Sequence, residues 1–236
     1  MNRYLDGKEI RELPTDFYEK SYYDSHYAQF LSDAAYFELK GLFWKKAIQS
    51  LWKVPDNCQM LDFGCGLGQV TAAFPECAYY DLSEFSRQFV RKRGNLVYND
   101  PGEIPEAHFD VILSSHSLEH TPDPCGLLQR FTRWTSAKGE LILILPIERN
   151  FSPRLEVDKD NHLFAWTFQT ISNLLHATGW QPCLADWIYD SWGLRQLSKR
   201  LGKESAIDLA WRLGKYIRTY RSMLLVARKR PSRDDV

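Results

Sequence analysis

Short apolar runs alternate along the chain with segments whose apolar residues recur at helical spacing. Helical spacing is clear at Leu127, Phe131 and Trp134, which follow one another at intervals of four and three. Alternation of strands and helices indicates βαβ units, a parallel sheet and a ligand site at the carboxyl ends of the strands. The pattern predicts an α/β, Rossmann-like, doubly wound sheet. Its predicted strands are residues 60–62, 78–80, 95–99, 109–116, 139–146, 180–189 and 222–228.

Polar residues mark the starts of several predicted helices. Ser83 precedes a helix that runs through residue 91, and Thr167 precedes another. A longer helix is expected over residues 32–52, and a helical insert is expected between the last two strands. The apolar stripe of this insert is expected to consist of Ala206, Ala210, Leu213 and Ile217.

Three glycines at alternate positions follow the first predicted strand. Glycine tolerates positive φ and lets the backbone approach a ligand, and the helix start expected after Gly68 would offer unpaired N–H groups. The dinucleotide pattern G-x-G-x-x-G would need glycine at Gln69. A nucleotide-like cofactor other than a dinucleotide is therefore expected. The alternative is an ordinary strand-to-helix turn.

The run DFGCGLG, from Asp62 to Gly68, resembles motif I of class I S-adenosylmethionine (SAM) dependent methyltransferases. In that family the segment holds the methionine end of SAM, and S-adenosylhomocysteine is the product. The resemblance extends from residue 60 to about residue 229. It implies a sheet of seven strands, mostly parallel, with an antiparallel last strand. It also implies a helical N-terminal segment that closes over cofactor and substrate.

Two aspartates after later strands complete the expected cofactor site. Asp81 ends the second strand, where a carboxylate can bind ribose hydroxyls; by itself it would be a turn residue or a helix cap. Asp100 begins a segment that resembles a family segment whose Asp faces the adenine amino group. The alternative for Asp100 is an ordinary Asp-Pro-Gly turn. The residues predicted to bind SAM are Asp62, Gly64, Cys65, Gly66, Gly68, Gln69, Asp81, Leu82, Asp100, Ser115 and His116.

The loop after the fourth predicted strand, residues 116–124, resembles that of small-molecule methyltransferases often grouped with the ubiquinone and menaquinone methylases. His116 and His162 are the candidate catalytic bases, because an imidazole titrates near neutral pH. His116 and His120 could equally be structural and hydrogen-bond the loop. The sequence has no Asn-Pro-Pro-Tyr segment at this place, so enzymes that methylate nucleic-acid bases are not favoured.

Aromatic residues crowd the N-terminal segment, and the last part of the chain is basic. The residues predicted to form a lid or to contact substrate are Tyr18, Tyr22, Tyr23, His26 and Tyr27. Aromatic faces can attract a sulfonium cation, but the same residues could instead pack a helix onto the sheet edge. From Ser191 onward, twelve Lys and Arg face four Asp and Glu. This region could meet an anionic substrate, or it could be a solvated surface.

Composition narrows the class of protein. The chain has 236 residues, 44% of them hydrophobic, which suits one enzyme-sized domain. A net charge of zero argues against a dedicated nucleic-acid partner. Five cysteines without a C-x-x-C pair indicate neither a disulfide framework nor a zinc site. No apolar run approaches the roughly 18–20 residues that span a bilayer, and the charged N-terminus lacks a signal-peptide core, so a cytoplasmic location is expected.

These observations predict an enzyme that moves a methyl group from SAM to a hydroxyl, with an amine as second choice, of a small molecule or glycan-type intermediate. The alternatives are a methyltransferase for peptide or protein side chains, in which the aromatic N-terminus and the basic insert form a wider cleft, and a non-catalytic partner subunit. No metal is expected, because no carboxylate cluster resembles that of the metal-dependent catechol methylases. One domain is expected, with a lid (1–56), a core (57–190), an insert (191–221) and a last strand and tail (222–236).

Overall fold

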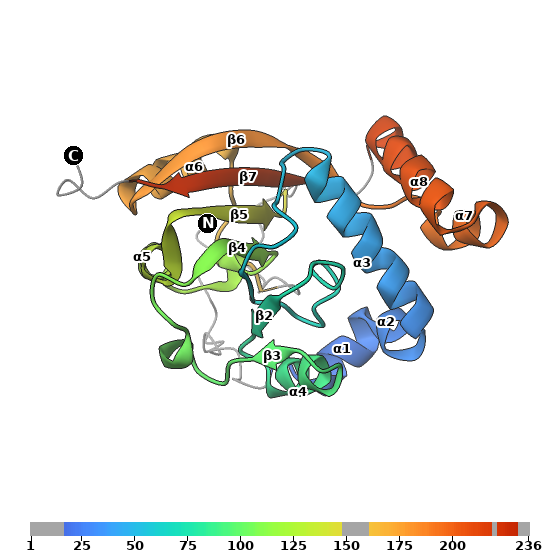
Figure 1. Ribbon diagram of the computed structural model, residues 1–236, viewed down its shortest axis with the longest axis horizontal. Coiled ribbons are helices and arrows are strands. Elements are labelled where there is room, and N and C mark those ends of the chain that lie inside the picture. The colour runs from blue at the N-terminus through green and yellow to red at the C-terminus, as the bar shows by residue number, and fades with distance from the viewer. Residues whose placement is uncertain (1–16, 148–160, 219–220, 231–236) are drawn as a thin grey trace, which may run out of the picture.

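The computed structural model describes residues 17–147, 161–218 and 221–230. Their strands form one sheet in the order β3-β2-β1-β4-β5-β7-β6 (Figure 1). Strands β1 to β5 pair in parallel, whereas β7 runs antiparallel to both of its neighbours. This confirms the predicted seven-stranded, mostly parallel sheet with an antiparallel last strand. The strands are β1 (Met60–Phe63), β2 (Cys77–Tyr80), β3 (Leu96–Val97), β4 (Phe109–Ser115), β5 (Thr135–Leu145), β6 (Trp180–Tyr189) and β7 (Arg221–Lys229).

Helices cover both faces of the sheet because the central strands are apolar on both sides. In β5, Ile142 and Ile144 pack with the helices α3 and α8, while Leu141 and Leu143 pack with α5 and α6 on the opposite face (Figure 1). Each fully buried Leu or Ile contributes about 1.5–3 kcal/mol. The helices are α1 (Lys20–His26), α2 (Ala28–Ser32), α3 (Ala34–Gln49), α4 (Glu84–Lys92), α5 (Pro124–Trp134), α6 (Phe168–Ala177), α7 (Leu194–Leu201) and α8 (Lys203–Ile217).

Both predicted N-caps are confirmed. The Ser83 hydroxyl accepts a hydrogen bond from the Ser86 N–H at 3.1 Å and so starts α4. Thr167 forms a capping box with Thr170 at the start of α6. Such caps satisfy N–H groups that have no partner within the helix, and each contributes about 1 kcal/mol.

The helix expected after the glycines does not form: residues 64–76 are a series of turns. The three glycines have positive φ, and Pro75 disfavours helical backbone at Phe74, which leaves too few residues for a helix. The N–H groups available here are therefore those of the glycine turn itself. The third strand is also shorter than predicted, and the fifth begins earlier, at Thr135, with a register shift against β4.

The buried stripe of α8 differs from the prediction. Leu213 is half-buried and Ile217 is 38% exposed. Helix α8 packs against its neighbours along a line of residues that are four positions apart. Gly214 lies on this line, because its backbone is next to the Asp190 carbonyl. Ile217 lies off that line. The residues buried in α8 are Ala206, Ile207, Ala210, Trp211 and Gly214.

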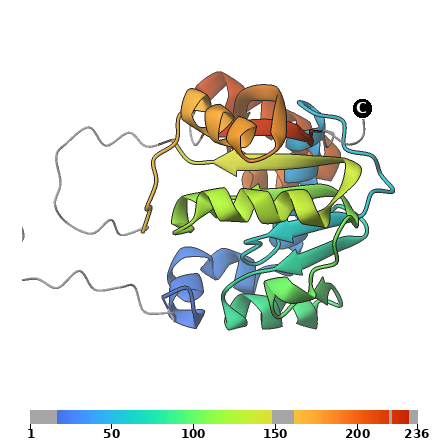
Figure 2. The same cartoon turned by 90° about the vertical axis from the view of Figure 1, so that its left-hand side faces the viewer.

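The N-terminal helices α1 and α2 lie on the side toward which the parallel strands point (Figure 2). The insert, α7 and α8, lies beside α3 (Figure 1), and Arg195 of α7 forms an ion pair with Asp33 at the start of α3. Lys46 of α3 forms an ion pair with Asp208 of α8 at 2.8 Å, and the rings of Phe43 and Trp211 lie 6.3 Å apart. Within the described parts of the chain, no helix combines the length and apolarity needed to cross a bilayer.

Candidate functional site

A cavity of about 1160 Å³ lies at the carboxyl ends of β1, β2 and β4, between the glycine turn and the N-terminal helices. Because parallel strands end at one edge, residues far apart in sequence meet there. The predicted site residues that line it are Asp62, Gly64, Cys65, Gly66, Gln69, Asp81, Leu82, Ser115, His116 and His162, with the aromatic set Tyr18, Tyr22, Tyr23, His26 and Tyr27.

Two predicted residues do not line this cavity. Gly68 packs against the ring of Tyr79, 3.1 Å from where a Cβ atom would be. Asp100 is exposed and accepts a hydrogen bond from the Gly102 N–H at 2.7 Å, as in the Asp-Pro-Gly turn that was its alternative. Its neighbour Pro101 reaches the cavity instead.

The glycine turn is fixed to the end of β2 by backbone hydrogen bonds. The N–H groups of Gly64 and Cys65 donate to the Tyr80 carbonyl at 2.8 and 3.1 Å. A Cβ atom on Gly64 would lie 2.1 Å from the Ser117 Oγ, so the neighbouring loop requires glycine here. Gly66 differs: with φ +53°, its added Cβ would meet nothing nearer than Tyr23 at 4.0 Å, in open space. Gly66 is thus the position where a ligand can approach the backbone.

Asp81 joins the glycine turn to the start of α4. One carboxylate oxygen accepts from the Gly66 N–H at 2.7 Å and the other from the Ser83 N–H at 2.8 Å. Each oxygen has two lone pairs, so both can accept a further hydrogen bond from a ligand. Burial raises the pKa of Asp81, and the two backbone N–H groups and Arg87 oppose that rise.

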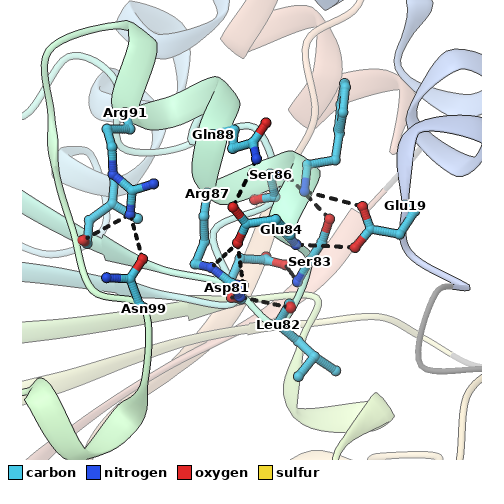
Figure 3. A network of polar contacts seen from close by, with 12 residues as sticks. Glu19, Asp81, Leu82, Ser83, Glu84, Ser86, Arg87, Gln88, Arg91 and Asn99 are labelled. Atoms are coloured by element: carbon cyan, nitrogen blue, oxygen red, sulfur yellow. Dashed lines mark hydrogen bonds and ion pairs between the residues drawn. The ribbon is translucent and has the colours of Figure 1, made fainter.

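The loop around Asp81 is further held from two sides, as Figure 3 shows. Arg87 donates to the carbonyls of Asp81 and Leu82 at 2.6 and 2.8 Å. Glu19, from the N-terminal segment, accepts from the N–H groups of Glu84 and Phe85 at 3.1 and 3.2 Å. The partial positive charge at the start of α4 favours this carboxylate. The N-terminal segment is therefore attached to the cofactor half of the site.

Two buried polar groups in the first strand and turn bear on the expected cofactor. Asp62 accepts a hydrogen bond from the Thr71 hydroxyl at 2.6 Å, and burial raises its pKa to about 7. Gln69 lines the cavity, and its Oε1 is buried without a hydrogen-bond partner among the described residues. A buried acceptor of this kind suits a ligand that brings an N–H donor, such as the amine of SAM. The residues present fit the cofactor.

His116 follows β4 directly, and its backbone has a φ of +50°, unusual for a residue other than glycine. Its Nε2 lies 3.0 Å from the Ser222 hydroxyl, and its Nδ1 lies 3.8 Å from Glu119 Oε1. The side chain is 45% exposed and lines the cavity. Burial, followed by His162 and His120, lowers the pKa of His116 to about 4. The ring is therefore neutral at pH 7.

The aromatic set both packs and lines the cavity, so the two alternatives for it are compatible. Tyr23 is buried and stacks on Phe85 of α4, with ring centroids 5.3 Å apart, and burial raises its pKa. Tyr22 stacks on His26 at 4.5 Å. The Tyr18 hydroxyl lies 3.0 Å from His120 Nδ1 and links the N-terminal segment to the loop after β4.

The sequence-based prediction missed a buried lysine, Lys40, that lines the cavity. Lys40 of α3 is only 6% exposed and donates to the Asp190 carboxylate and, at 2.8 Å, to the Ser191 hydroxyl. Its Nζ lies 5.3 and 5.5 Å from the ring centroids of Phe43 and Trp44. One signal was visible: a lysine on the apolar face of a predicted helix needs a partner. Its partner, 150 positions away, was not.

The basic insert does not widen the cleft. Of the described residues from 191 onward, only Ser191 lines the cavity. The insert packs on α3 through Trp211 and the ion pair of Lys46 with Asp208. The wider cleft expected for the protein-methylating alternative is therefore wrong for this part of the chain.

The family model that matches the chain is described as a methyltransferase domain, and the match covers residues 34–185, more than half of the chain. This chain belongs to the methyltransferase-domain family. The match includes the glycine turn, Asp81 and His116 and ends within β6. A comparison with curated proteins found no match.

Solved methyltransferase structures share the fold. A 1,6-didemethyltoxoflavin-N1-methyltransferase from Burkholderia thailandensis is 19% identical, with a TM-score of 0.54, over 89% of this chain and 87% of that one. A geranyl diphosphate C-methyltransferase from Streptomyces coelicolor A3(2) is 15% identical, with a TM-score of 0.56, over 81% of this chain and 77% of that one. A "putative methyltransferase" from Bacillus halodurans C-125 is 17% identical, with a TM-score of 0.54, over 80% of this chain and 99% of that one. The prediction of a class I SAM-dependent methyltransferase is confirmed at the level of family and fold.

Proposed function

We propose that this methyltransferase moves the methyl group of SAM to a hydroxyl, with an amine as second choice, of a small molecule or glycan-type intermediate. The observation that carries the proposal is the continuous cavity, which joins the glycine turn and Asp81 to His116 and the N-terminal aromatic side chains. At about 1160 Å³ it exceeds the roughly 300–1,000 Å³ of a pocket for one drug-sized ligand, so cofactor and a small acceptor can share it.

In this proposal, the methionine end of SAM lies against Gly66 and Gln69, and the ribose hydroxyls bind Asp81. SAM supplies an activated methyl group; the chain orients the two reactants and excludes water, which can lower the barrier by about 7–11 kcal/mol. His116 and His162 are the candidate bases, a role that contributes about 10²- to 10⁴-fold, and a pKa of about 4 makes His116 a weak base at neutral pH. The C- and N-methyltransferases of similar fold were both solved with S-adenosylhomocysteine, which supports the cofactor and leaves the accepting atom open.

The described residues share one sheet and continuous cores, which supports treating residues 1–236 as one methyltransferase domain. The lid (1–56), core (57–190), insert (191–221) and tail (222–236) are segments of it. Residues 1–16, 148–160, 219–220 and 231–236, which belong to these segments, lie outside the described residues.

Calorimetric titration of the full chain with SAM, S-adenosylhomocysteine and NAD tests the cofactor half of the proposal. We expect micromolar binding of the first two and none of NAD. Absence of binding for all three, in a sample shown to be folded, would contradict the proposal and favour a non-catalytic partner subunit. A mass-shift screen of hydroxyl-bearing small molecules against peptides then tests the acceptor class.

A further inference from the structure

Three side chains from two segments converge on the cavity wall: Glu119, His120 and His162. Each offers one oxygen or nitrogen atom, and these atoms all lie within 4.8 Å of one another. All three residues line the cavity. Glu119 is fully buried, and both histidines are partly buried. Two imidazoles and one carboxylate are a ligand set that proteins use for zinc and for non-haem iron.

The tautomer of His120 is set by the protein. Its Nδ1 lies 3.0 Å from the carbonyl oxygen of Asn161, which can only accept, so Nδ1 carries the hydrogen. Asn161 has a φ of +56°, a conformation that Asn tolerates better than most residues. Nε2 lies 3.8 Å from Glu119 Oε1. An Nδ1–H···O=C bond is the usual support of a metal-binding histidine, because it fixes the ring and directs Nε2 toward the metal.

The two loops are joined by their backbones as well. The Leu163 and Phe164 N–H groups donate to the Glu119 carbonyl at 2.9 and 3.2 Å, and the Tyr18 hydroxyl contacts His120 Nδ1 at 3.0 Å. His162 is thereby held beside His120, with ring centroids 5.0 Å apart. Ligand atoms about 2.0–2.2 Å from a metal are about 3.0–3.5 Å from one another. Side-chain rotations that move each ligand atom by about 1 Å would therefore bring all three within bonding distance of one ion.

We propose that Glu119, His120 and His162 bind a divalent transition metal ion at the wall of the cavity. Imidazole ligands favour Zn²⁺, Fe²⁺ or Co²⁺ over Mg²⁺, which prefers oxygen ligands. Three protein ligands leave coordination positions open toward the cavity, where an oxygen atom of the acceptor can bind. This last step rests on the proposed methyl transfer, whereas the metal site itself does not. The sequence predicted no metal and gave His162 the role of a base, which a metal-bound imidazole nitrogen would not also fill. Residue spacing alone could not show that ligands on separate loops meet.

The test uses the purified full chain, treated with a chelator and then titrated with Co²⁺, followed by its visible absorption, and with Zn²⁺ by calorimetry. We expect one ion per chain and weaker binding of Mg²⁺. In Glu119→Gln and His162→Ala the affinity should fall at least about 100-fold, because loss of a ligand should exceed the 10- to 100-fold effect of an outer-shell partner. The matched control is His176→Ala, an exposed histidine on α6, which should bind like the wild type.

Absence of Co²⁺ and Zn²⁺ binding, or equal affinity in His162→Ala, would overturn the inference. Because Glu119 is buried, circular dichroism checks the fold of its variant, and the partly buried His162 gives an independent reading. SAM titration of the same samples separates the two proposals. Intact SAM binding without metal binding removes only the metal site, and metal binding without SAM binding removes only the proposed function.

Discussion

The two halves of the cavity are built differently. In the cofactor half, the glycine turn is held to the end of β2, because the Gly64 and Cys65 N–H groups donate to the Tyr80 carbonyl and the Gly66 N–H donates to the Asp81 carboxylate. In the opposite half, side chains such as Tyr18, Lys40 and His120 make contacts that join segments about 100 to 150 positions apart. The first half is fixed by the parallel sheet and suits a common cofactor. The second half depends on how segments outside the parallel sheet pack against it. We expect this half to determine which acceptor the enzyme binds.

The largest effect is expected from Asp62, in the cofactor half. An isolated carboxyl group loses its proton near pH 3.9, but burial raises the pKa of Asp62 to about 7. Between these values the folded state binds more protons than the unfolded state, so the stability contributed by this group falls as pH rises, by about 4 kcal/mol in all. Asp62→Asn keeps the acceptor for Thr71 and should remove this dependence. Urea unfolding of both proteins between pH 4 and 8 measures it; parallel pH profiles would refute the assignment.

Asp81→Ala should weaken SAM binding about 10- to 100-fold, because hydrogen bonds to a charged group contribute about 1.5–3 kcal/mol. Calorimetry gives the affinity, and thermal unfolding shows whether the fold survives. Unchanged SAM affinity would remove the ribose assignment.

Asp100→Ala is the matched comparison, since Asp100 is exposed and its neighbour Pro101, not Asp100 itself, lines the cavity. We expect SAM affinity within about twofold of the wild type, because loss of an exposed residue outside the cavity removes no contact to a ligand there. A loss as large as that of Asp81→Ala would restore Asp100 as the predicted adenine contact.

In the opposite half, Tyr18→Phe removes one hydroxyl and leaves the ring in place. Loss of the contact with His120 should cost about 0.5–1.5 kcal/mol, or about 2- to 10-fold in turnover, with SAM affinity unchanged. Steady-state kinetics with an accepted substrate and calorimetry with SAM measure the two quantities. A change in SAM affinity alone would show that the halves are not separable in this way.

Among the variants expected to change a property, Glu19→Gln, where the two halves meet, should have the smallest effect. The neutral side chain can still accept from the start of α4 but loses its favourable charge there, which should cost about 0.3–1 kcal/mol. Limited proteolysis should cut the N-terminal segment about two to five times faster. Equal cleavage rates would mean that this contact does not hold the segment in place.

Much of the fold was predictable because its signals are local. The parallel pairing of β1 to β5, the caps at Ser83 and Thr167 and the meeting of Asp81 with the glycine turn all follow from short patterns and from parallel βαβ topology. The helix expected after the glycines was wrong because positive φ values and Pro75 outweighed a weak helical pattern. Burial of Ile217 was wrong because the neighbours of α8 decide which stripe is buried.

The sequence by itself determined the alternation of strands and helices, the family resemblance carried by DFGCGLG and the edge at which a cofactor would lie, because each depends on residues close together in the chain. Only the tertiary structure decided that Lys40 pairs with Asp190, that Glu19 meets α4 and that His162 joins Glu119. These contacts lie between segments far apart in the chain. Their geometry comes from how apolar faces pack, which residue spacing does not encode.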